Sequence, residues 1–408
     1  MIANLRDSIR ELAVIFRGNV GVIAISWLLF SITGALVNPF FAKYAKDLGA
    51  SDYDVAVIRS LGMLALALSL VPGGLITDYF GRVKPILVGT GLVALSQFLY
   101  AVAPDWRVLM VVYVVDMASH FYQPALTAII MDSLQHGVEF KGFLGLNIVS
   151  MIPGLFMPIV GGFLYEIVGV SGIRIGFALQ GIVATVVLIL RIKALKETFR
   201  PLNKDFSKLV LELAGYRGVL SRALKLYVYT SILLQLALGV PNTYMALYAM
   251  DVLGLSKPLW GVLSAASTLG SMLALLALIS KRNVSRGRLA LAGSATASLS
   301  LVLAALAYYV NSSWTRFALL FACSTALGIS LNVVQASISA TLTQILPVEV
   351  RGRATGIQRL LDNVGAAASS YIAAHLYTRL GHVESFITSS SIGLVATAYL
   401  YTVLARTL

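Results

Sequence analysis

Ionisable side chains lie inside long apolar runs of this sequence, where a charge is costly and is therefore a candidate for function. Asp116 and His120 are four residues apart, so a helix would place them on one face, and Gln123 follows on an adjacent turn. A carboxylate and an imidazole can both take up and release a proton near neutral pH. This pair therefore predicts a proton-transfer site, with a histidine that only hydrogen-bonds a neighbouring helix as the simpler alternative.

Two further apolar runs add ionisable residues to this set. Arg59 lies at a similar depth and could pair with Asp116, either as a proton-sensitive bridge or as a structural ion pair. Arg359 and Asp362 could pair with each other on one helix, because they are three residues apart. The candidate proton-coupling residues are Asp116, His120, Arg59 and Asp362.

Motifs for enzymatic chemistry are missing from the sequence. It contains no GxxxxGK[ST], HExxH, GxSxG or paired CxxC. The single cysteine, Cys323, cannot form an intramolecular disulfide and lies in an apolar run, as a small buried hydrophobe would. We therefore expect no enzymatic activity, no cofactor and no metal site.

Composition places these residues in a membrane protein. Of 408 residues, 58% are hydrophobic and 12% are charged, and the mean hydropathy is +0.85, whereas about a quarter of a soluble domain is charged. A net charge of +13 could indicate nucleic-acid binding, but the basic residues lie between apolar stretches and not on one face or arm. The expected partner is the lipid bilayer, and no nucleic acid.

Apolar stretches long enough to span a membrane, about 20 residues, occur twelve times. They are continuous and not alternating, which predicts helices and excludes a barrel. Most of the 31 Lys and Arg residues lie in segments on the side of both termini, so both termini are predicted to be cytoplasmic. Short loops favour a prokaryotic cytoplasmic membrane. The stretches are 20–41, 55–78, 85–103, 108–131, 142–165, 173–190, 223–246, 259–279, 289–310, 316–341, 355–377 and 384–404.

The two halves of the chain repeat each other. Tyr44 and Asp47 recur as Tyr248 and Asp251 at one constant spacing, and three later clusters match in the same order. Six helices repeated in parallel place a ligand site between the halves, near the membrane midplane. The predicted fold is an all-α polytopic membrane protein with two six-helix halves, residues 1–190 and 223–408, joined by a cytoplasmic linker at 191–222.

Two charged segments are expected to lie on the membrane surface. Residues 1–17 carry apolar side chains at helical spacing among their charges, which predicts a surface helix and not a cleavable signal peptide. Residues 204–217 of the linker show the same pattern, with a disordered linker as the alternative.

A motif that could act as a latch lies at residues 74–84 (GLITDYFGRVK), between the second and third spans. Its first glycine would allow close helix approach, its aspartate could accept hydrogen bonds from a helix end, and its second glycine would allow a tight turn. Its arginine could reach Asp132. The motif resembles GxxxDRxGR[KR] of the major facilitator superfamily, although Tyr79 replaces the usual base. The resemblance implies a cytoplasmic latch of Gly74, Asp78, Gly81, Arg82 and Asp132; ordinary positive-inside residues are the alternative.

The fifth span carries a helix-packing motif, GLFMPIVGG, in which a proline would bend the helix and glycines would allow contact with the other half. It resembles GxxxGPxxGG of the drug:proton antiporters in that superfamily, with Met157 in place of the inner glycine. Generic packing by small residues is the alternative. The motif residues are Gly154, Pro158, Gly161 and Gly162.

In this superfamily the first, fourth, seventh and tenth spans line a central cavity. The resemblance therefore implies a substrate site formed by polar residues of those spans, although some of them could serve only as hydrogen bonds between helices. The arginine that is frequent in the fourth span of drug antiporters is absent here. The candidate substrate-binding residues are Asn38, Gln123, Gln235, Asn242, Asn332 and Gln335.

Together these features predict a secondary active transporter that works by alternating access. We expect proton-coupled export of a small amphipathic molecule, neutral or cationic, by a monomer. Uptake or facilitated transport of a metabolite, such as a sugar or an organic acid, is the alternative. A non-transporting membrane receptor is disfavoured because the chain shows no sizeable soluble domain.

Overall fold

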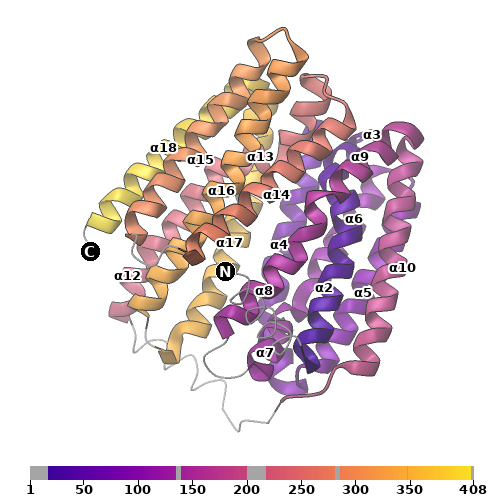
Figure 1. Cartoon of the computed structure of the whole chain (residues 1–408), viewed down its shortest axis with the longest axis vertical. Helices are drawn as coiled ribbons and strands as arrows, with labels where there is room; N and C mark the ends of the chain where they lie inside the picture. The colour runs from indigo at the N-terminus through magenta and orange to yellow at the C-terminus, as the bar shows by residue number, and fades with distance from the viewer. Residues whose placement is uncertain (1–16, 135–138, 200–216, 281–284, 347, 406–408) are drawn as a thin grey trace, which may run out of the picture.

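The computed structural model describes residues 17–134, 139–199, 217–280, 285–346 and 348–405. Helices account for every regular element in these ranges, and the two halves of the chain lie side by side (Figure 1). The surface helices expected at residues 1–17 and 204–217 fall almost wholly outside the described residues. The linker is shorter than expected, because α10 continues to Ala194 and α12 already begins at Arg217.

The six expected spans of the first half coincide with helices. Each of three spans is divided by a 3₁₀ turn, and the others are single helices. The elements are α2 (Gly18–Val37), η1 (Asn38–Phe40) and α3 (Phe41–Asp47); α4 (Asp52–Phe80); α5 (Val83–Val102); α6 (Trp106–Ser119), η2 (His120–Tyr122) and α7 (Gln123–Ser133); α8 (Glu139–Met151), η3 (Ile152–Leu155) and α9 (Met157–Val168); and α10 (Val170–Ala194).

The second half follows the same plan. Its seventh span contains two short π-helical turns and its eleventh ends in another. The elements are α12 (Arg217–Val228), η4 (Tyr229–Leu233), α13 (Leu234–Leu247) and η5 (Tyr248–Val252); α14 (Lys257–Ser280); α15 (Arg286–Leu306) with η6 (Ala307–Tyr309); α16 (Ser313–Ile345); α17 (Val348–His375) with η7 (Leu376–Leu380); and α18 (His382–Ala405).

Ten helices of the described chain are long and apolar enough to cross a membrane. The other two expected spans are α6–η2–α7 and α17. The first is interrupted at His120–Tyr122, and the second carries Arg359 and Asp362 within its length. These two spans thus depart from simple apolar helices at the residues singled out as candidates for function.

Prolines explain the breaks in the first half. Pro39, Pro124 and Pro153 lie in or just after the 3₁₀ turns of the first, fourth and fifth spans. A proline lacks the N–H group that would continue the helix, and its ring crowds the preceding turn. The breaks place Asn38 and His120 at bends of their spans.

The internal repeat is visible in side-chain contacts. The Tyr44 hydroxyl donates to the Tyr100 carbonyl at 2.8 Å, and the Tyr248 hydroxyl donates to the Ala304 carbonyl at 3.0 Å. Each bond spans 56 residues of chain. The two halves therefore fold by the same tertiary contacts.

The halves meet chiefly through α4 against α17 and α9 against α14. We call the side of the bundle on which α10 ends and α12 begins the linker side, and the opposite side the far side. The hydrogen bonds and ion pairs that join the halves in the described chain lie at or towards the far side; they are Tyr53–Tyr371, Ser60–Ala367, Tyr244–Asp52, Trp260–Pro39, Lys43–Asp251 and Lys257–Glu166.

Candidate functional site

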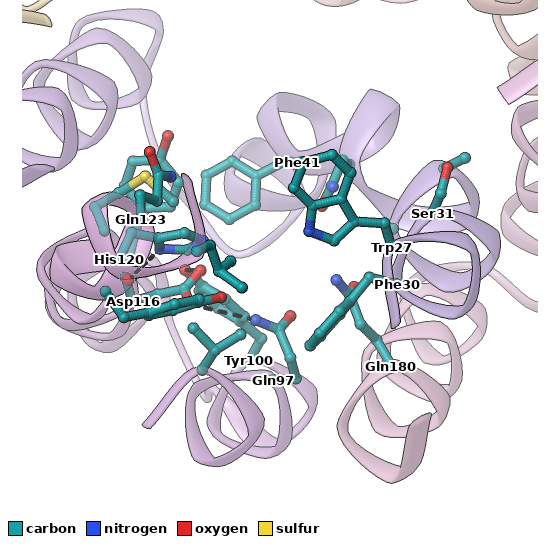
Figure 2. Close-up of a pocket in the computed structure, with 18 of the residues that line it drawn as sticks. Trp27, Phe30, Ser31, Phe41, Gln97, Tyr100, Asp116, His120, Gln123 and Gln180 are labelled. Atoms are coloured by element: carbon teal, nitrogen blue, oxygen red, sulfur yellow. Dashed lines mark hydrogen bonds between the residues drawn. The ribbon is translucent and has the colours of Figure 1, made fainter. Parts of the chain in front are cut away.

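A cavity of about 810 Å³ lies among the helices of the first half (Figure 2). Its walls come from α2, α3, α4, α5, the α6–α7 span, α8 and α10, and Arg359 of α17 adds the other half's contribution. Because the fourth span bends at η2, His120 and Gln123 both face the cavity, and Asn38 reaches it from the break in the first span. Five of the predicted residues thus line one cavity: Asn38, Arg59, Asp116, His120 and Gln123.

Asp116 is the buried acid of this cavity, with 6% of its surface exposed. The Tyr100 hydroxyl donates to one carboxylate oxygen at 3.1 Å, and the Gln97 amide donates to the other at 3.4 Å. Both donors are neutral. The full charge of an ionised Asp116 is therefore only partly compensated by its immediate partners.

His120 faces the cavity one turn after Asp116. Its Nδ1 lies 2.8 Å from the backbone carbonyl oxygen of Asp116. A carbonyl oxygen can only accept a hydrogen bond, so Nδ1 carries the proton and Nε2 of the neutral ring remains an acceptor. His120 and Asp116 therefore offer two protonatable positions in one wall.

Aromatic side chains cover much of the remaining wall. Trp27 and Phe30 of α2 and Phe41 of α3 point into the opening opposite Asp116 (Figure 2). Tyr113 of α6 packs on Phe41, with ring centroids 4.8 Å apart. Such a surface suits the apolar body of an amphipathic ligand.

A second cavity, of about 310 Å³, lies between the halves. Asn38 from the first half and Asn242 from the second both line it. Phe41, Arg59 and Tyr113 line both cavities, so the two spaces adjoin. The site is therefore lopsided: most of its volume and all of its acidic lining belong to the first half.

Arg59 does not form the expected ion pair with Asp116. Both residues line the larger cavity, but Asp116 is bonded to Gln97 and Tyr100 instead. The buried Nε atom of Arg59 has no hydrogen-bond partner. The sequence offered the Arg59 pairing as one possibility, and Gln97 and Tyr100 of α5 bond to the carboxylate instead.

Asp362 also takes a partner other than the one expected. The Ser231 hydroxyl donates to Asp362 at 2.5 Å, and no ion pair joins Asp362 to Arg359 in the described chain. Asp362 lines neither cavity, and three of the predicted polar residues are likewise outside both linings. Asn332 donates to the Gly328 carbonyl of its own helix at 3.1 Å, and the others are Gln235 and Gln335.

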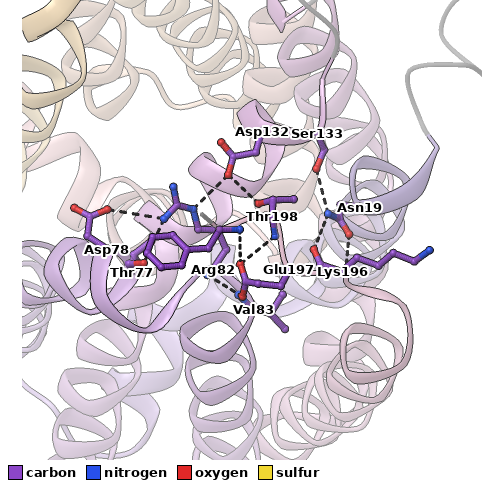
Figure 3. Close-up of polar contacts among 11 residues, drawn as sticks. Asn19, Thr77, Asp78, Arg82, Val83, Asp132, Ser133, Lys196, Glu197 and Thr198 are labelled. Carbon is purple, nitrogen blue, oxygen red and sulfur yellow. Dashed lines mark hydrogen bonds and ion pairs between the residues drawn. The ribbon is translucent and has the colours of Figure 1, made fainter. Parts of the chain in front are cut away.

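The latch motif forms a polar cluster on the linker side (Figure 3). Gly81 has φ +87°, a conformation that favours glycine, and turns the chain between α4 and α5. Arg82 Nε lies 3.3 Å from an oxygen of Asp132, as expected, and Thr198 donates to the same oxygen at 2.8 Å. All these partners belong to the first half, so the cluster does not bridge the halves in this conformation.

Glu197 takes the place that the sequence assigned to Asp78. It accepts the backbone N–H groups of Arg82 and Val83 at the start of α5, whereas the side chain of Asp78 is 79% exposed and 3.9 Å from Arg82. Partial burial opposes ionisation of Glu197, but the backbone N–H groups of Arg82, Val83, Phe199 and Thr198 hold the pKa of its carboxyl below the ordinary value. Gly74, expected to allow close helix approach, has no neighbour within 4 Å of an added Cβ.

The packing motif of the fifth span lies where the backbones of neighbouring helices approach closely. A Cβ added to Gly161 would lie 2.0 Å from the Leu36 carbonyl oxygen of α2, and one added to Gly162 would lie 2.6 Å from the Lys257 carbonyl oxygen of α14. Gly154 faces Thr268 of α14, and Pro158 starts α9 after the η3 turn. These contacts join the fifth span both to its own half and to the other.

Several cavity residues carry no motif in the sequence. Gln97 and Tyr100 hold Asp116, Gln180 faces it across the opening, and Arg191 is a fully buried arginine of α10 (Figure 2). Polar residues within an apolar span were the available signal for Gln97, Gln180 and Arg191. No group of three or more His, Cys, Asp or Glu side chains gathers as a metal site within the described residues.

Comparison with protein families decides the identity of the fold. Residues 23–329 match the model of the Major Facilitator Superfamily. This chain belongs to that superfamily. It is therefore an integral multi-pass membrane protein with the two-half, twelve-helix architecture expected from the sequence.

Relatives of this superfamily member include two bacterial drug-resistance proteins. It is 25% identical over 217 residues to the quinolone resistance protein NorA of Staphylococcus aureus, and 27% identical over 237 residues to the multi-drug resistance efflux pump PmrA of Streptococcus pneumoniae. The matches cover 53% and 56% of this chain and 54% and 58% of those proteins. The chain thus matches little more than half the length of these curated relatives. The matches agree with the drug:proton antiporter pattern that the motifs of the chain predict.

Solved structures share the fold of this superfamily member at low sequence identity. A D-xylose–proton symporter superposes with a TM-score of 0.75 at 15% identity, covering 94% of this chain and 96% of the other. A bacterial homolog of the human lysosomal transporter Spinster gives 0.72 at 14% identity, covering 95% and 96%. These similarities extend over nearly the whole chain and establish the fold alone.

Proposed function

We propose that this transporter is a proton-coupled exporter of a small amphipathic molecule and that it works by alternating access. The observation that carries the proposal is Asp116, a buried carboxylate with two neutral donors in the wall of a large cavity. Efflux as the direction is supported by the two bacterial relatives, whose names describe drug resistance.

The conformation fits a carrier open to one side. Contacts between the halves join them at the far side, while the partners of the latch cluster around Arg82 within the described residues all belong to the first half. We assign the linker side to the cytoplasm, because basic residues concentrate in the segments on that side. In this assignment the cavity loads from the cytoplasm.

Proton exchange at Asp116 supplies the coupling. An ionised Asp116 draws the Tyr100 hydroxyl and the Gln97 amide towards it, whereas a neutral Asp116 can itself donate a hydrogen bond. His120 Nε2 offers a second acceptor one turn away and can pass a proton between the cavity and the carboxylate. Proton binding thus changes the charge of the cavity wall and the relative stability of the two open states.

The proposal is tested in proteoliposomes of known orientation that contain a pH-sensitive dye. Addition of a transported compound should produce a proton flux, and Asp116→Asn should abolish it while leaving the fold intact. Glu384→Gln is the matched control, because that acid is exposed in the first turn of α18 and outside both cavities. Undiminished coupled flux in Asp116→Asn would reject Asp116 as the coupling residue, and substrate accumulation coupled to inward proton movement would reject export in favour of uptake.

A further inference from the structure

Three guanidinium groups line the large cavity, against one carboxylate. Arg59, Arg191 and Arg359 come from three different helices, and Asp116 is the acid among the described lining residues. His120 adds a further positive charge whenever it is protonated. The cavity therefore carries an excess of positive charge.

Arg191 contributes a positive charge that has no anionic partner in the described chain. Its side chain is 1% exposed and donates to two hydroxyl oxygens, Thr90 at 2.5 Å and Ser26 at 3.3 Å. The rings of Phe30 and Tyr122 lie 5.7 and 5.9 Å from its guanidinium carbon. These partners fix the group in place but leave its charge uncompensated.

Arg59 and Arg359 have donors to spare. The buried Nε of Arg59 has no hydrogen-bond partner, although Asp116 lines the same cavity. Arg359 is exposed on α17, and the carboxylate nearest in its helix, Asp362, is bonded to Ser231. Neither guanidinium is in an ion pair within the described chain.

Three lysines at the far side of the bundle behave differently. Lys43 lies 2.9 Å from Asp47 and 3.0 Å from Asp251, Lys46 lies 2.6 Å from Asp52, and Lys257 lies 3.3 Å from Glu166. Arg174 and Arg316 lie outside both cavities and donate to backbone carbonyl oxygens. The three cavity arginines are therefore distinguished by lining a space that a ligand can enter.

We propose that the cavity binds small molecules that carry an anionic group, a carboxylate, sulfonate or phosphonate, on an aromatic or aliphatic body. An unpaired charge in a low-dielectric site is costly, and a ligand anion removes that cost by pairing with it. Guanidinium groups bind such anions through paired N–H donors. This inference rests on the proposed function and changes its substrate class from neutral or cationic to anionic or zwitterionic.

The three arginines have different parts in this site. Arg59 and Arg359 contact the anionic group, because their guanidiniums have open donors. Arg191 is a positioning residue that adds positive potential from behind the Phe30 and Tyr122 rings. The apolar body of the ligand lies among Trp27, Phe30 and Phe41. A zwitterion would in addition place its cationic group at Asp116.

Binding to the purified full chain, in neutral detergent at constant pH and without a gradient, tests this proposal. The probes are 1-naphthaleneacetate, its uncharged amide and 1-naphthylmethylammonium, which share one aromatic body. We expect the acetate to bind at least tenfold more tightly than the amide or the ammonium, as measured by calorimetry. Equal or tighter binding of the amide or the ammonium would overturn the proposal.

Variants locate the anion. Arg59→Gln and Arg359→Gln should each weaken acetate binding about tenfold, because each removes a charge-assisted hydrogen bond to the anion, while amide binding stays the same. Arg107→Gln is the control, because Arg107 is exposed beside Trp106 in the first turn of α6. Arg59→Lys and Arg359→Lys should keep part of the affinity. Unchanged acetate binding in both Gln variants, with normal thermal unfolding, would reject the site.

A lipid headgroup offers the same anionic chemistry as a small solute. Short-chain phosphatidylglycerol is therefore added as a competitor, with the zwitterionic phosphatidylcholine of equal length as its control. Binding of phosphatidylglycerol at Arg59 and Arg359 without binding of the acetate would assign the site to lipid and overturn the substrate proposal. These measurements need no proton gradient, so a failure here is distinct from loss of proton coupling in Asp116→Asn.

Discussion

Tyr100 connects the buried acid of the cavity to the far side of the first half. Its hydroxyl donates to Asp116, its backbone carbonyl accepts from Tyr44, and its ring packs on Phe41 and Phe177. A change in the charge of Asp116 therefore acts on a residue that also holds α3 against α5. Tyr100 is a candidate for passing the proton signal from the cavity to the contact between the halves.

Tyr100→Phe isolates the hydroxyl, because the ring contacts and the backbone bond to Tyr44 remain. Loss of one hydrogen bond to a charged group corresponds to about 1.5 kcal/mol or more, so we expect substrate-driven proton flux to fall about tenfold. The measurement is the initial rate of dye response in proteoliposomes, with Tyr113→Phe as the aromatic control in the same cavity wall. A flux equal to that of the unmodified protein would show that Gln97 alone suffices.

At the linker side, Glu197 predicts a pH-dependent attachment of the α4–α5 turn. Its pKa lies below that of an ordinary glutamate, so its stabilising contribution is present above the pKa of the unfolded chain. The contribution is lost as the pH falls through the lower, folded value. The Arg82 and Val83 amides should lose their protection from hydrogen exchange in acid, after correction for intrinsic rates. In Glu197→Gln they should lack this protection already at neutral pH. Asp78→Asn should change neither, because that side chain is 79% exposed.

Among the elements, α9 and α14 bring the two halves into close backbone contact. A Cβ added to Gly162 of α9 would lie 2.6 Å from the Lys257 carbonyl oxygen. A Cβ added to Gly261 of α14 would lie 2.3 Å from the Pro158 carbonyl oxygen. Backbone atoms cannot swing away as a flexible side chain can. The spacing of these two helices is therefore set by glycines on both, and any added methyl group must separate them.

Gly162→Ala should force α9 and α14 apart and destabilise the conformation with the far side closed. Overpacking of this kind costs about 1–3 kcal/mol, which should lower the thermal-unfolding midpoint and reduce cross-linking between cysteines placed on the two helices. Gly74→Ala is the matched control: it has no neighbour within 4 Å and should gain up to about 1 kcal/mol of helix propensity. If both variants unfold at the same temperature, the close approach does not limit this interface.

Span positions and the repeat could be predicted because they depend on local hydropathy and on similarity along the chain. The partners of single residues could not, since they come from distant helices: Asp116 was assigned to Arg59, and α5 supplies Gln97 and Tyr100 instead. Glu197 was missed for the same reason, because only the folded chain brings it to the start of α5. Asn38 and Asn242, which the family resemblance placed among the substrate-binding residues, line the second cavity, whereas Asn332 bonds to the Gly328 carbonyl of its own helix.

Across the whole molecule, the repeat is closed asymmetrically at the far side. Asp47 and Asp251 are repeat-related, and one lysine of the first half, Lys43, lies within 3.0 Å of both. The position that corresponds to Lys43 in the second half is Leu247, which is buried and carries no charge. A single ammonium group thus holds both aspartates, and its loss leaves two carboxylates facing each other across the contact between the halves.

Lys43→Gln should consequently shift the population towards a state open at the far side. Ion pairs that are partly exposed contribute up to about 1 kcal/mol each, so the equilibrium should move severalfold and not completely. The reporter is a pair of cysteines introduced at Tyr53 and Tyr371, whose hydroxyls are 3.0 Å apart across the halves. The native Cys323 is fully buried, so it does not compete for the cross-linker. Cross-linking of Tyr53→Cys with Tyr371→Cys should fall in Lys43→Gln and stay unchanged in Lys46→Gln, whose partner Asp52 belongs to the same half. Equal cross-linking in both would mean that the tyrosine and tryptophan hydrogen bonds close the far side without the lysine, and that the asymmetry of the repeat has no part in alternating access.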